Sequence, residues 1–411
     1  MNPKNSWLTH SLLWHASIAC FLIAVLTGFL YRVGMLGWVP GNLSLGNIRH
    51  AHSHLMFFGW AVPLPLYIFL YQISSITDQS KNWLQLMYYA LAAELTLGLL
   101  AYPFFLFYGY RPVQIGSLSL PLSVIISGLV MVCWYIYLWG YLHVRSYLKK
   151  TSWQAWFDGA LLMLVVSSLG AWGIAILQAV GPSSHLFMEG LTHFFLATFT
   201  EGWVVLALIT ILITQSSTTS SDSLTSQNLS LACIAIGAPL TFPYGISESL
   251  LSPILLIVAR AGGLLTAIGL IAILYTLISS AMAKNRIWIW PILLLSIKAG
   301  IQIIASVMPS SFWLSDHALR ILYLHILLLG GFTLGVIGYV HINSRVSTSY
   351  YYGVVLSVCA VLISLLLPSP LWPTDWSGLW VFYALAITAI FPVVAVLVEW
   401  VKVSIDHSKH V

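Results

Sequence analysis

Histidine is the most prominent chemical feature of this chain, which has 13 His against 11 acidic residues among 411. Ionisable side chains are costly inside a membrane and usually mark a functional site there. The imidazoles gather near the start of three apolar segments: His50, His52 and His54; His185 and His193; His317 and His325. Three separate segments that bring imidazole to one depth predict a metal or haem site.

The second group has the most regular spacing. His185, Glu189 and His193 are four residues apart, so on a helix they form a line along one face, and Glu201 continues that line two turns later. Carboxylate and imidazole ligands together suit iron, copper or zinc, and we predict a second metal site at His185, Glu189 and His193. The alternative is a chain of hydrogen-bonded polar groups packed between helices.

The first group favours a single ligand. His50, His52 and His54 alternate by two, so on a regular helix they point in different directions. At most one of them, or one with a neighbour at a frayed helix end, can reach a given metal. The alternative is a polar cap at the membrane interface.

In the third group, His325 lies about two helical turns inside its segment. Small residues follow it, namely Gly330, Gly331 and Gly335. Glycine allows a bulky group to approach the backbone closely. That group is either another helix or a porphyrin plane.

Long apolar helices must position these side chains. Only 7% of the residues are charged, 59% are hydrophobic and the mean hydropathy is +0.92, whereas a soluble domain has about 25% charged residues. The lipid bilayer must therefore cover most of the surface. Because a spanning helix needs about 20 apolar residues, we predict an all-α bundle of about twelve transmembrane helices in one integral membrane domain, 1–411. The predicted spans lie near 11–31, 51–72, 83–107, 117–142, 156–180, 187–214, 228–245, 250–281, 287–307, 318–342, 350–368 and 377–402.

Two of the apolar runs and the four cysteines need separate interpretation. The first apolar run lacks a basic start and a small-residue cleavage site, so it is interpreted as a membrane helix and not as a removable signal peptide. The seventh run is the weakest because it contains two prolines. The cysteines lie far apart in apolar runs and are expected to be buried small residues and not metal ligands: Cys20, Cys133, Cys233 and Cys359.

Lys and Arg are distributed unevenly between the loops. With the N-terminus inside, ten of them fall on the inner side and four on the outer side. Because positively charged loops favour the cytoplasm, both termini are predicted to be cytoplasmic, in a bacterial-type inner membrane. The net charge of +5 follows from the same bias and requires no nucleic-acid partner.

The segment 48–60, with Arg49 three residues before His52 and an aromatic residue at Trp60, resembles helix II of the catalytic subunit I of the haem-copper oxidase superfamily. The cbb-type oxidases and nitric oxide reductases are the most similar branches. In that family this His is an axial ligand of the low-spin haem. The segment 323–332 resembles helix X, where another His binds the same haem. The resemblance therefore implies one low-spin haem b held by His52 and His325.

Two departures concern the family's second metal centre. Tyr323 stands where the family has the His of its high-spin haem, and the seventh span lacks the His pair that binds copper or non-haem iron. On the sixth span, 185–190 resembles the reductases' His-x-x-x-Glu-Gly, although another register places Glu189 at the ligand position. Catalytic residues are therefore unknown, and oxygen reduction by the family mechanism is not expected.

A second resemblance is to the nitric-oxide-response membrane proteins, which share this helical core. It is carried by the His-Ala-His at 50–52 near a Phe-Gly, and by His325 followed by Gly331 and later His341. This resemblance requires no oxidase centre.

Three functions follow as hypotheses, and we prefer the first. It is electron transfer or nitrogen-oxide chemistry by a membrane haem protein, with cytochrome c or other respiratory subunits as partners; whether the protein is itself an oxidoreductase is open. The second is an ion or proton-coupled transporter without haem. Its path would be lined by intramembrane charges: Glu94, Asp158, Glu189, Glu201, Arg260 and Lys298. The third is a non-catalytic assembly or structural subunit of a respiratory complex.

Overall fold

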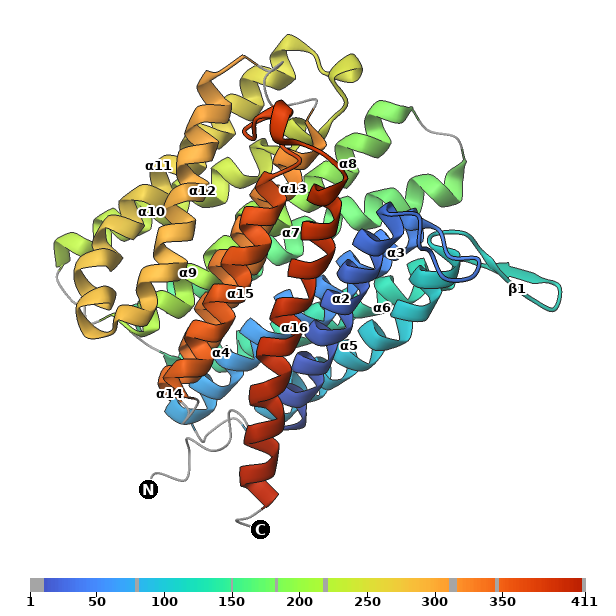
Figure 1. The fold of residues 1–411 in the computed structure, drawn as a ribbon. Helices are drawn as coiled ribbons and strands as arrows, with labels where there is room; N and C mark the ends of the chain where they lie inside the picture. Colours follow the sequence, from blue (N-terminus) through green and yellow to red (C-terminus); the bar gives the residue numbers. More distant parts are fainter. Residues whose placement is uncertain are drawn as a thin grey trace. The chain divides into compact units, whose positions relative to one another are not determined.

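The computed structural model describes residues 11–77, 81–148, 151–181, 184–216, 221–309, 316–343 and 347–408. These residues form helices and one short hairpin, and eleven helical segments among them are long and apolar enough to cross a membrane. A further long helix, α10, covers Ser221–Leu240. The predicted all-α membrane bundle of about twelve helices is therefore confirmed (Figure 1).

The contacts divide the chain into two compact units. One comprises Met1–Lys149 with Tyr339–Val411, and the other is Lys150–Gly338. We call them the first and the second unit and describe each by itself. That the whole chain 1–411 forms one membrane domain stays a prediction.

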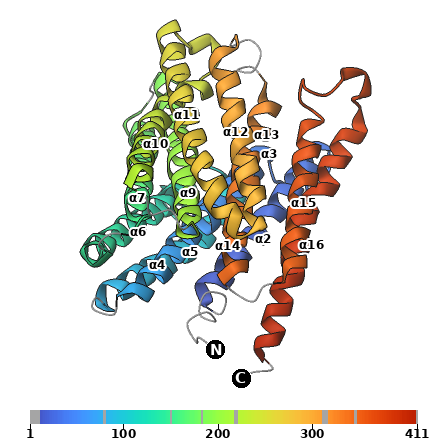
Figure 2. The same ribbon diagram turned by 90° about the vertical axis from the view of Figure 1, so that its left-hand side faces the viewer.

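Among its described residues, the first unit contains four helical segments long and apolar enough to span a membrane before residue 149 and two after residue 339. Its helices α5 and α6 pack against each other, and so do α15 and α16 (Figure 2). The bounds are α2 (Leu12–Met35), α3 (Leu45–Met56), η2 (Phe57–Ala61), α4 (Pro63–Ile76), α5 (Lys81–Tyr108), β1 (Val113–Ile115), β2 (Leu118–Leu120), α6 (Leu122–Val144), η3 (Arg145–Leu148), α15 (Thr348–Leu366), η10 (Thr374–Trp376) and α16 (Leu379–Ser408).

The second unit is a set of antiparallel helices joined by short connections. Helix α11 packs against both α10 and α12. The bounds are α7 (Gln154–Val180), α8 (His185–Ala197), η4 (Thr198–Val204), α9 (Val205–Thr214), α10 (Ser221–Leu240), η5 (Phe242–Gly245), η6 (Glu248–Leu250), α11 (Pro253–Lys284), η7 (Arg286–Trp288), α12 (Ile289–Val307), α13 (His317–His325), η9 (Ile326–Phe332) and α14 (Thr333–Asn343), the last of which ends in the first unit.

Three of the spans share one construction. Each begins with a helix that carries the imidazoles, passes through a turn or two of π-helix (η2, η4 or η9) and continues as an α-helix. In an 18-residue stretch of these spans, 83%, 94% and 72% of the residues are buried, against at most 56% in the others. Single π-helical turns inside α-helices occur frequently at functional sites. The imidazole-rich segments therefore begin the three most buried spans.

The starts of these three helices are set locally. Ser44, Ser184 and Asp316 each accept a hydrogen bond, through the side chain, from a backbone N–H three residues later. Such N-caps satisfy one of the amide groups that has no partner within the helix. The first turn of each imidazole-bearing helix is thereby fixed by its own sequence.

The seventh span differs from its predicted limits of 228–245. Helix α10 begins earlier, at Ser221, and ends at Leu240, after which Phe242–Gly245 form a separate 3₁₀ turn. Pro243 occupies the start of that turn, where its missing N–H costs nothing. The chain therefore leaves the α-helix before Tyr244, which belongs to the 3₁₀ turn that follows it.

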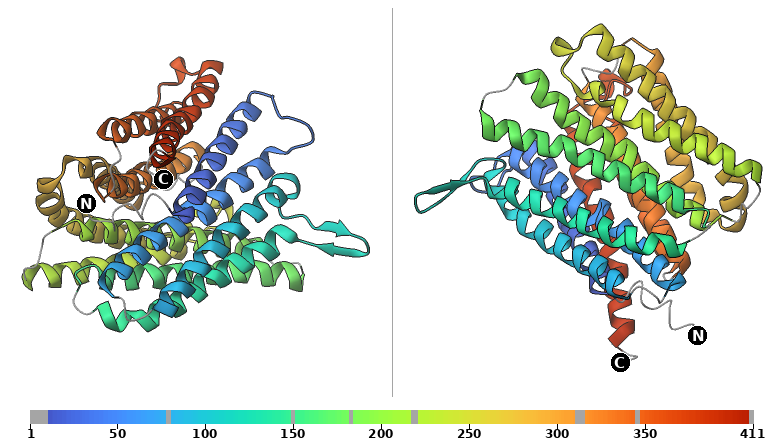
Figure 3. Two further views of the ribbon diagram at one scale, coloured as in Figure 1. Left: turned by 90° about the horizontal axis from the view of Figure 1, so that it is seen from below. Right: turned by 180° about the vertical axis from the view of Figure 1, so that it is seen from behind.

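A β-hairpin between α5 and α6 was not predicted. Its strands β1 and β2 pair antiparallel, with Ile115 opposite Leu118. Gly116 has φ of 61°, a left-handed conformation that suits the two-residue turn. The hairpin extends beyond the ends of α5 and α6 (Figure 3).

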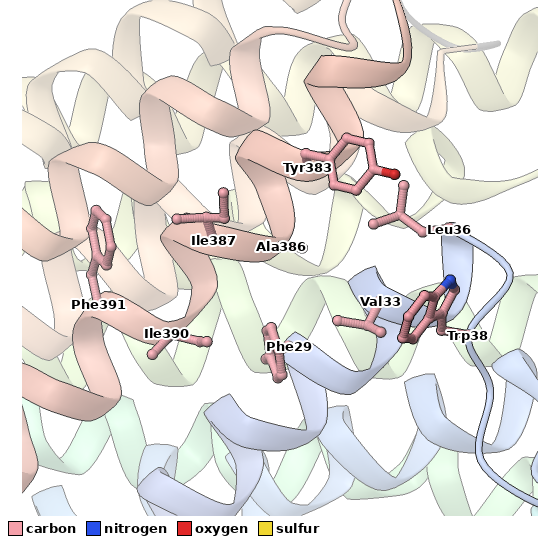
Figure 4. A pocket seen from close by; sticks show the side chains of 9 residues that line it. All are labelled: Phe29, Val33, Leu36, Trp38, Tyr383, Ala386, Ile387, Ile390 and Phe391. Carbon is pink, nitrogen blue, oxygen red and sulfur yellow. The ribbon is translucent and has the colours of Figure 1, made fainter.

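The first unit also has an apolar groove of about 440 Å³ between α2 and α16 (Figure 4). The polar side-chain atoms of its lining are the hydroxyl oxygen of Tyr383 and the indole nitrogen of Trp38; the other lining side chains are hydrocarbon. The lining residues are Phe29, Val33, Leu36, Trp38, Tyr383, Ala386, Ile387, Ile390 and Phe391.

Close packing at the first π-helix gives a stability prediction. A Cβ added at Gly59 would clash with the side chain of Cys20 on α2, so Gly59→Ala should destabilise the protein by about 1–3 kcal/mol through overpacking. Gly353→Ala on α15 is the matched control, because no atom lies within 4 Å of its added Cβ. Thermal unfolding in detergent measures both variants; equal midpoints would contradict the packing argument.

Candidate functional site

An ion pair is buried in the second unit. Lys298 of α12 pairs through its Nζ with Oε2 of Glu201 in η4, and the exposed fractions of the two side chains are 0% and 6%. Removing two charges from water costs several kcal/mol per ion unless the geometry and further hydrogen bonds compensate. The pair can therefore persist only if its remaining donors and acceptors are satisfied.

Two neighbours supply those hydrogen bonds. Lys298 also donates to Oε1 of Gln302 at 2.8 Å, and Nε2 of Gln302 donates to Oε2 of Glu201 at 2.9 Å. Tyr323 of α13 donates its hydroxyl to the other carboxylate oxygen, Oε1, at 2.7 Å. Its ring centroid lies 5.8 Å from Nζ of Lys298, within range of a cation–π interaction. Both oxygens of Glu201 are thus held by donors, and the four side chains form one network.

Local sequence explains how the network assembles. Lys298 and Gln302 are four residues apart, so they share one face of α12. Glu201 lies within the π-helical turn, where the extra residue per turn changes the direction of the side chains. The sequence predicted Lys298 and Glu201 among the charges of an ion path and placed Glu201 on the imidazole face, but it did not identify Gln302 or the hydrogen bond of Tyr323.

The network continues toward the end of α12. Ser306, one turn after Gln302, accepts or donates a hydrogen bond with the hydroxyl of Tyr244 at 3.1 Å and donates to the carbonyl of Gln302 at 2.7 Å. Burial raises the pKa of Tyr244, opposed by Ser306 and by the charge of Arg260. Its phenol therefore stays protonated at neutral pH.

Two residues of the predicted metal site on α8, Glu189 and His193, contact the connection between α10 and α11. Glu189 accepts hydrogen bonds from the backbone N–H and the hydroxyl of Ser247, at 2.7 and 2.8 Å. His193 packs directly beneath Gly245 of the same connection, where a Cβ would clash with its ring. Within the described residues, no group of three or more His, Cys, Asp or Glu side chains is placed to hold a metal ion. A metal at His185, Glu189 and His193 stays a prediction.

His52 is the member of the first group that faces α2. Its Nδ1 lies 2.7 Å from the carbonyl oxygen of Ala24. Gly28, one turn later on α2, leaves room for the ring, since an added Cβ would lie 3.1 Å from its Cε1. The ring orientation is therefore fixed by a neighbouring helix.

The other two imidazoles of this group point elsewhere. His54 stacks on Phe105 with ring centroids 3.8 Å apart, and its Nε2 lies 3.3 Å from the hydroxyl of Tyr110. The ring of His50 meets the ring of Tyr110 at 4.7 Å. The two rings contribute to a polar and aromatic cap near the hairpin, as the period-two spacing leads one to expect.

His325 belongs to the second unit and ends α13. Its Nδ1 lies 2.8 Å from the carbonyl of Ile321. The glycines that follow it meet other helices, because a Cβ at Gly331 would touch Leu295 and a Cβ at Gly335 would clash with Leu208. At Gly331 and Gly335, the group that approaches the backbone is a side chain of another helix.

His52 and His325 each have a ring nitrogen that an axial haem ligand requires. An imidazole whose Nδ1–H is held by a carbonyl presents its Nε2 as the ligand atom, and this second contact fixes the ring's tautomer and orientation. Both rings are half-buried, although they lie on two of the most buried spans. The two residues belong to different units, and each is described within its own.

Comparison with known proteins adds no family assignment: no family model matches the chain, and no curated protein matches it. The resemblance to the haem-copper oxidases and to the nitric-oxide-response proteins therefore stays a prediction.

Separating the two charges of the ion pair should be costly. Glu201→Gln or Lys298→Met alone leaves an uncompensated charge in an apolar interior, and each should destabilise the protein by about 3–5 kcal/mol. The double variant removes both charges and should recover most of that loss. Thermal unfolding of the four proteins in detergent forms a double-mutant cycle; strictly additive effects would show that the two residues are not coupled.

Proposed function

We propose that this polytopic membrane protein is a b-type haem protein that transfers electrons, with one low-spin haem and His52 and His325 as its axial ligands. The proposal starts from the resemblance of 48–60 and 323–332, and the observation that supports it is that each imidazole has its Nδ1 held by a backbone carbonyl, 2.7 Å from Ala24 and 2.8 Å from Ile321, a contact that His54 and His143 also make. Two such ligands leave no open coordination position on the iron, so the haem would carry electrons and not bind a gas.

The hydrogen bond of Tyr323 supports the proposal of one haem and not two. In the resembling family this position holds the ligand of a second haem, whereas here its hydroxyl donates to Glu201 at 2.7 Å. A phenol engaged by a buried carboxylate is a poor candidate for iron ligation. The proposed role is therefore electron transfer or a nitrogen-oxide-related function, in contact with cytochrome c or other respiratory subunits, and not oxygen reduction.

The proposed location is a bacterial-type inner membrane with both termini in the cytoplasm. The excess of Lys and Arg on one side, ten against four, supports this orientation. Under it the imidazole-rich ends of the three most buried spans lie near the outer surface, where a soluble electron carrier would dock.

Loss of either proposed ligand should abolish the six-coordinate spectrum. His52→Ala and His325→Ala are each expected to remove most of the bound haem from protein purified with haem supplied during expression, measured as the Soret absorbance per polypeptide. His143→Ala on α6 is the control, because this exposed ring stacks on Trp83 and its Nδ1 is also held by a backbone carbonyl, that of Trp139. Full haem content in both single variants would refute the assignment.

Ion or proton-coupled transport is the second candidate, and the buried pair of Glu201 and Lys298 favours it. Among the other charges expected on an ion path, Glu94 accepts a hydrogen bond from Trp134 at 2.9 Å and Arg260 donates to the carbonyl of Met308 at 3.1 Å. A colourless preparation that moves protons or ions across liposomes, and loses this flux in Lys298→Met, would select transport over electron transfer.

A further inference from the structure

One face of α12 changes from apolar to polar along its length. Lys298, Gln302 and Ser306 follow each other at intervals of four residues, and none is more than 4% exposed. On the same side of the helix, Leu294 and Leu295 precede Lys298 and are also buried, with 7% and 0% of their surfaces exposed. We call Lys298, Gln302 and Ser306 the polar strip. Burying polar groups is costly unless they are hydrogen-bonded, so the groups that meet the strip at each end indicate where it leads.

Toward the end of α12 the polar strip reaches the loop between α10 and α11. Ser306 contacts the hydroxyl of Tyr244 at 3.1 Å. Gly263 of α11 leaves space for this contact, since an added Cβ would clash with Oγ of Ser306 and lie 3.2 Å from the hydroxyl of Tyr244. Arg260, one turn earlier on α11, donates to the carbonyl of Met308 just beyond the end of α12. Polar groups therefore extend from the ion pair to this end of the unit.

In the opposite direction the surroundings of the pair are hydrocarbon. Leu208 and Leu295 are completely buried there, between the glycines of η9 and α14 and their neighbours. Among the described residues in this direction, the hydroxyl groups of Thr210 and Thr333 donate within their own helices, to Leu206 and Leu328. The polar strip on α12 therefore begins at Lys298, and the apolar side chains of Leu294 and Leu295 precede it on the helix.

We propose that the Glu201–Lys298 pair is a proton-binding site that exchanges protons only with the membrane face at which α12 ends. Protonation converts the Glu201 carboxylate to the neutral acid while Lys298 remains an ammonium ion, so one proton is bound and no other bond is broken. Under the predicted orientation this face is the outer one. The proposal needs no haem, and its failure would leave the electron-transfer proposal untouched.

Other ionisable groups on the elements that surround the pair must be considered as sources of a pH response. On the neighbouring elements of the second unit these groups include Asp158 on α7, His185, Glu189 and His193 on α8, Cys233 on α10, Tyr244 on η5, Arg260 and Tyr275 on α11, and His317, Arg320, Tyr323 and His325 on α13. Tyr323 is the one that touches the carboxylate. A test must therefore read the carboxyl group itself.

The experiment uses the full chain in liposomes of uniform orientation and records the carboxylic C=O stretch by infrared difference spectroscopy. A drop from about pH 8 to about pH 4, which spans ordinary carboxyl titration, is applied to one face at a time. We expect a Glu201-dependent band when the face at the end of α12 is acidified and none when the opposite face is acidified. A band that arises equally from both faces, only from the opposite face, or from neither would overturn the proposal.

Variants assign the signal and the route. Glu201→Gln should remove the band, whereas Glu94→Gln, which alters a buried carboxyl of the first unit, should leave it intact. Tyr323→Phe removes the hydrogen bond to Oε1 of Glu201 and should shift the frequency of the band, because the C=O stretch depends on the hydrogen bonds of the carboxyl group; this keeps the test available if Glu201→Gln does not fold. An unchanged frequency in Tyr323→Phe would contradict the assignment to Glu201.

The route is tested by a matched pair of hydroxyl deletions. Ser306→Ala on the polar strip should slow the appearance of the band severalfold without moving its pH midpoint. Thr333→Val, on the apolar side of the pair, should leave the rate unchanged because its hydroxyl bonds within its own helix. Equal rates in the two variants would show that protons do not pass along the strip.

Discussion

A charge in a membrane interior must be neutralised by a partner, and the second unit is organised around this requirement. Glu201 and Lys298 lie on separate spans, and Gln302 and Tyr323 complete the set of donors and acceptors. Because each member would be unpaired without the others, the network ties η4, α12 and α13 together at one depth. It also restricts how those helices can pack.

The three most buried spans share one construction. Each has an N-cap that begins it, an imidazole-bearing first segment and a π-helical turn before a second segment that is more buried. The imidazoles at 50, 52, 54, 185, 193, 317 and 325 lie in the first segments, whereas apolar residues predominate in the second. This division separates the part of each helix that stabilises the bundle from the part that is available for chemistry.

The proposed haem ligands and the ion pair represent two kinds of chemistry in one chain. His52 and His325 are held by carbonyl contacts that fix a ring and present a nitrogen, whereas Glu201 and Lys298 are held by each other. An electron-carrying group changes charge as it is reduced, and a proton-binding pair with access to one membrane face could compensate such a change. The two proposals are thus chemically compatible, although each stands on its own observations.

The sequence by itself determined the membrane class, the all-α architecture and nearly all of the spans, because 20-residue apolar runs and the scarcity of charge are local properties. The period-two spacing also predicted that His50, His52 and His54 point in different directions, and the structure gives the three rings different neighbours. Tertiary structure decided which residues meet: Tyr323 with Glu201, Glu189 with Ser247, and the glycines after His325 with Leu208 and Leu295. These partners are 58 to 122 residues apart where hydrogen bonds join them, and no pattern within one helix specifies which face of another it will contact.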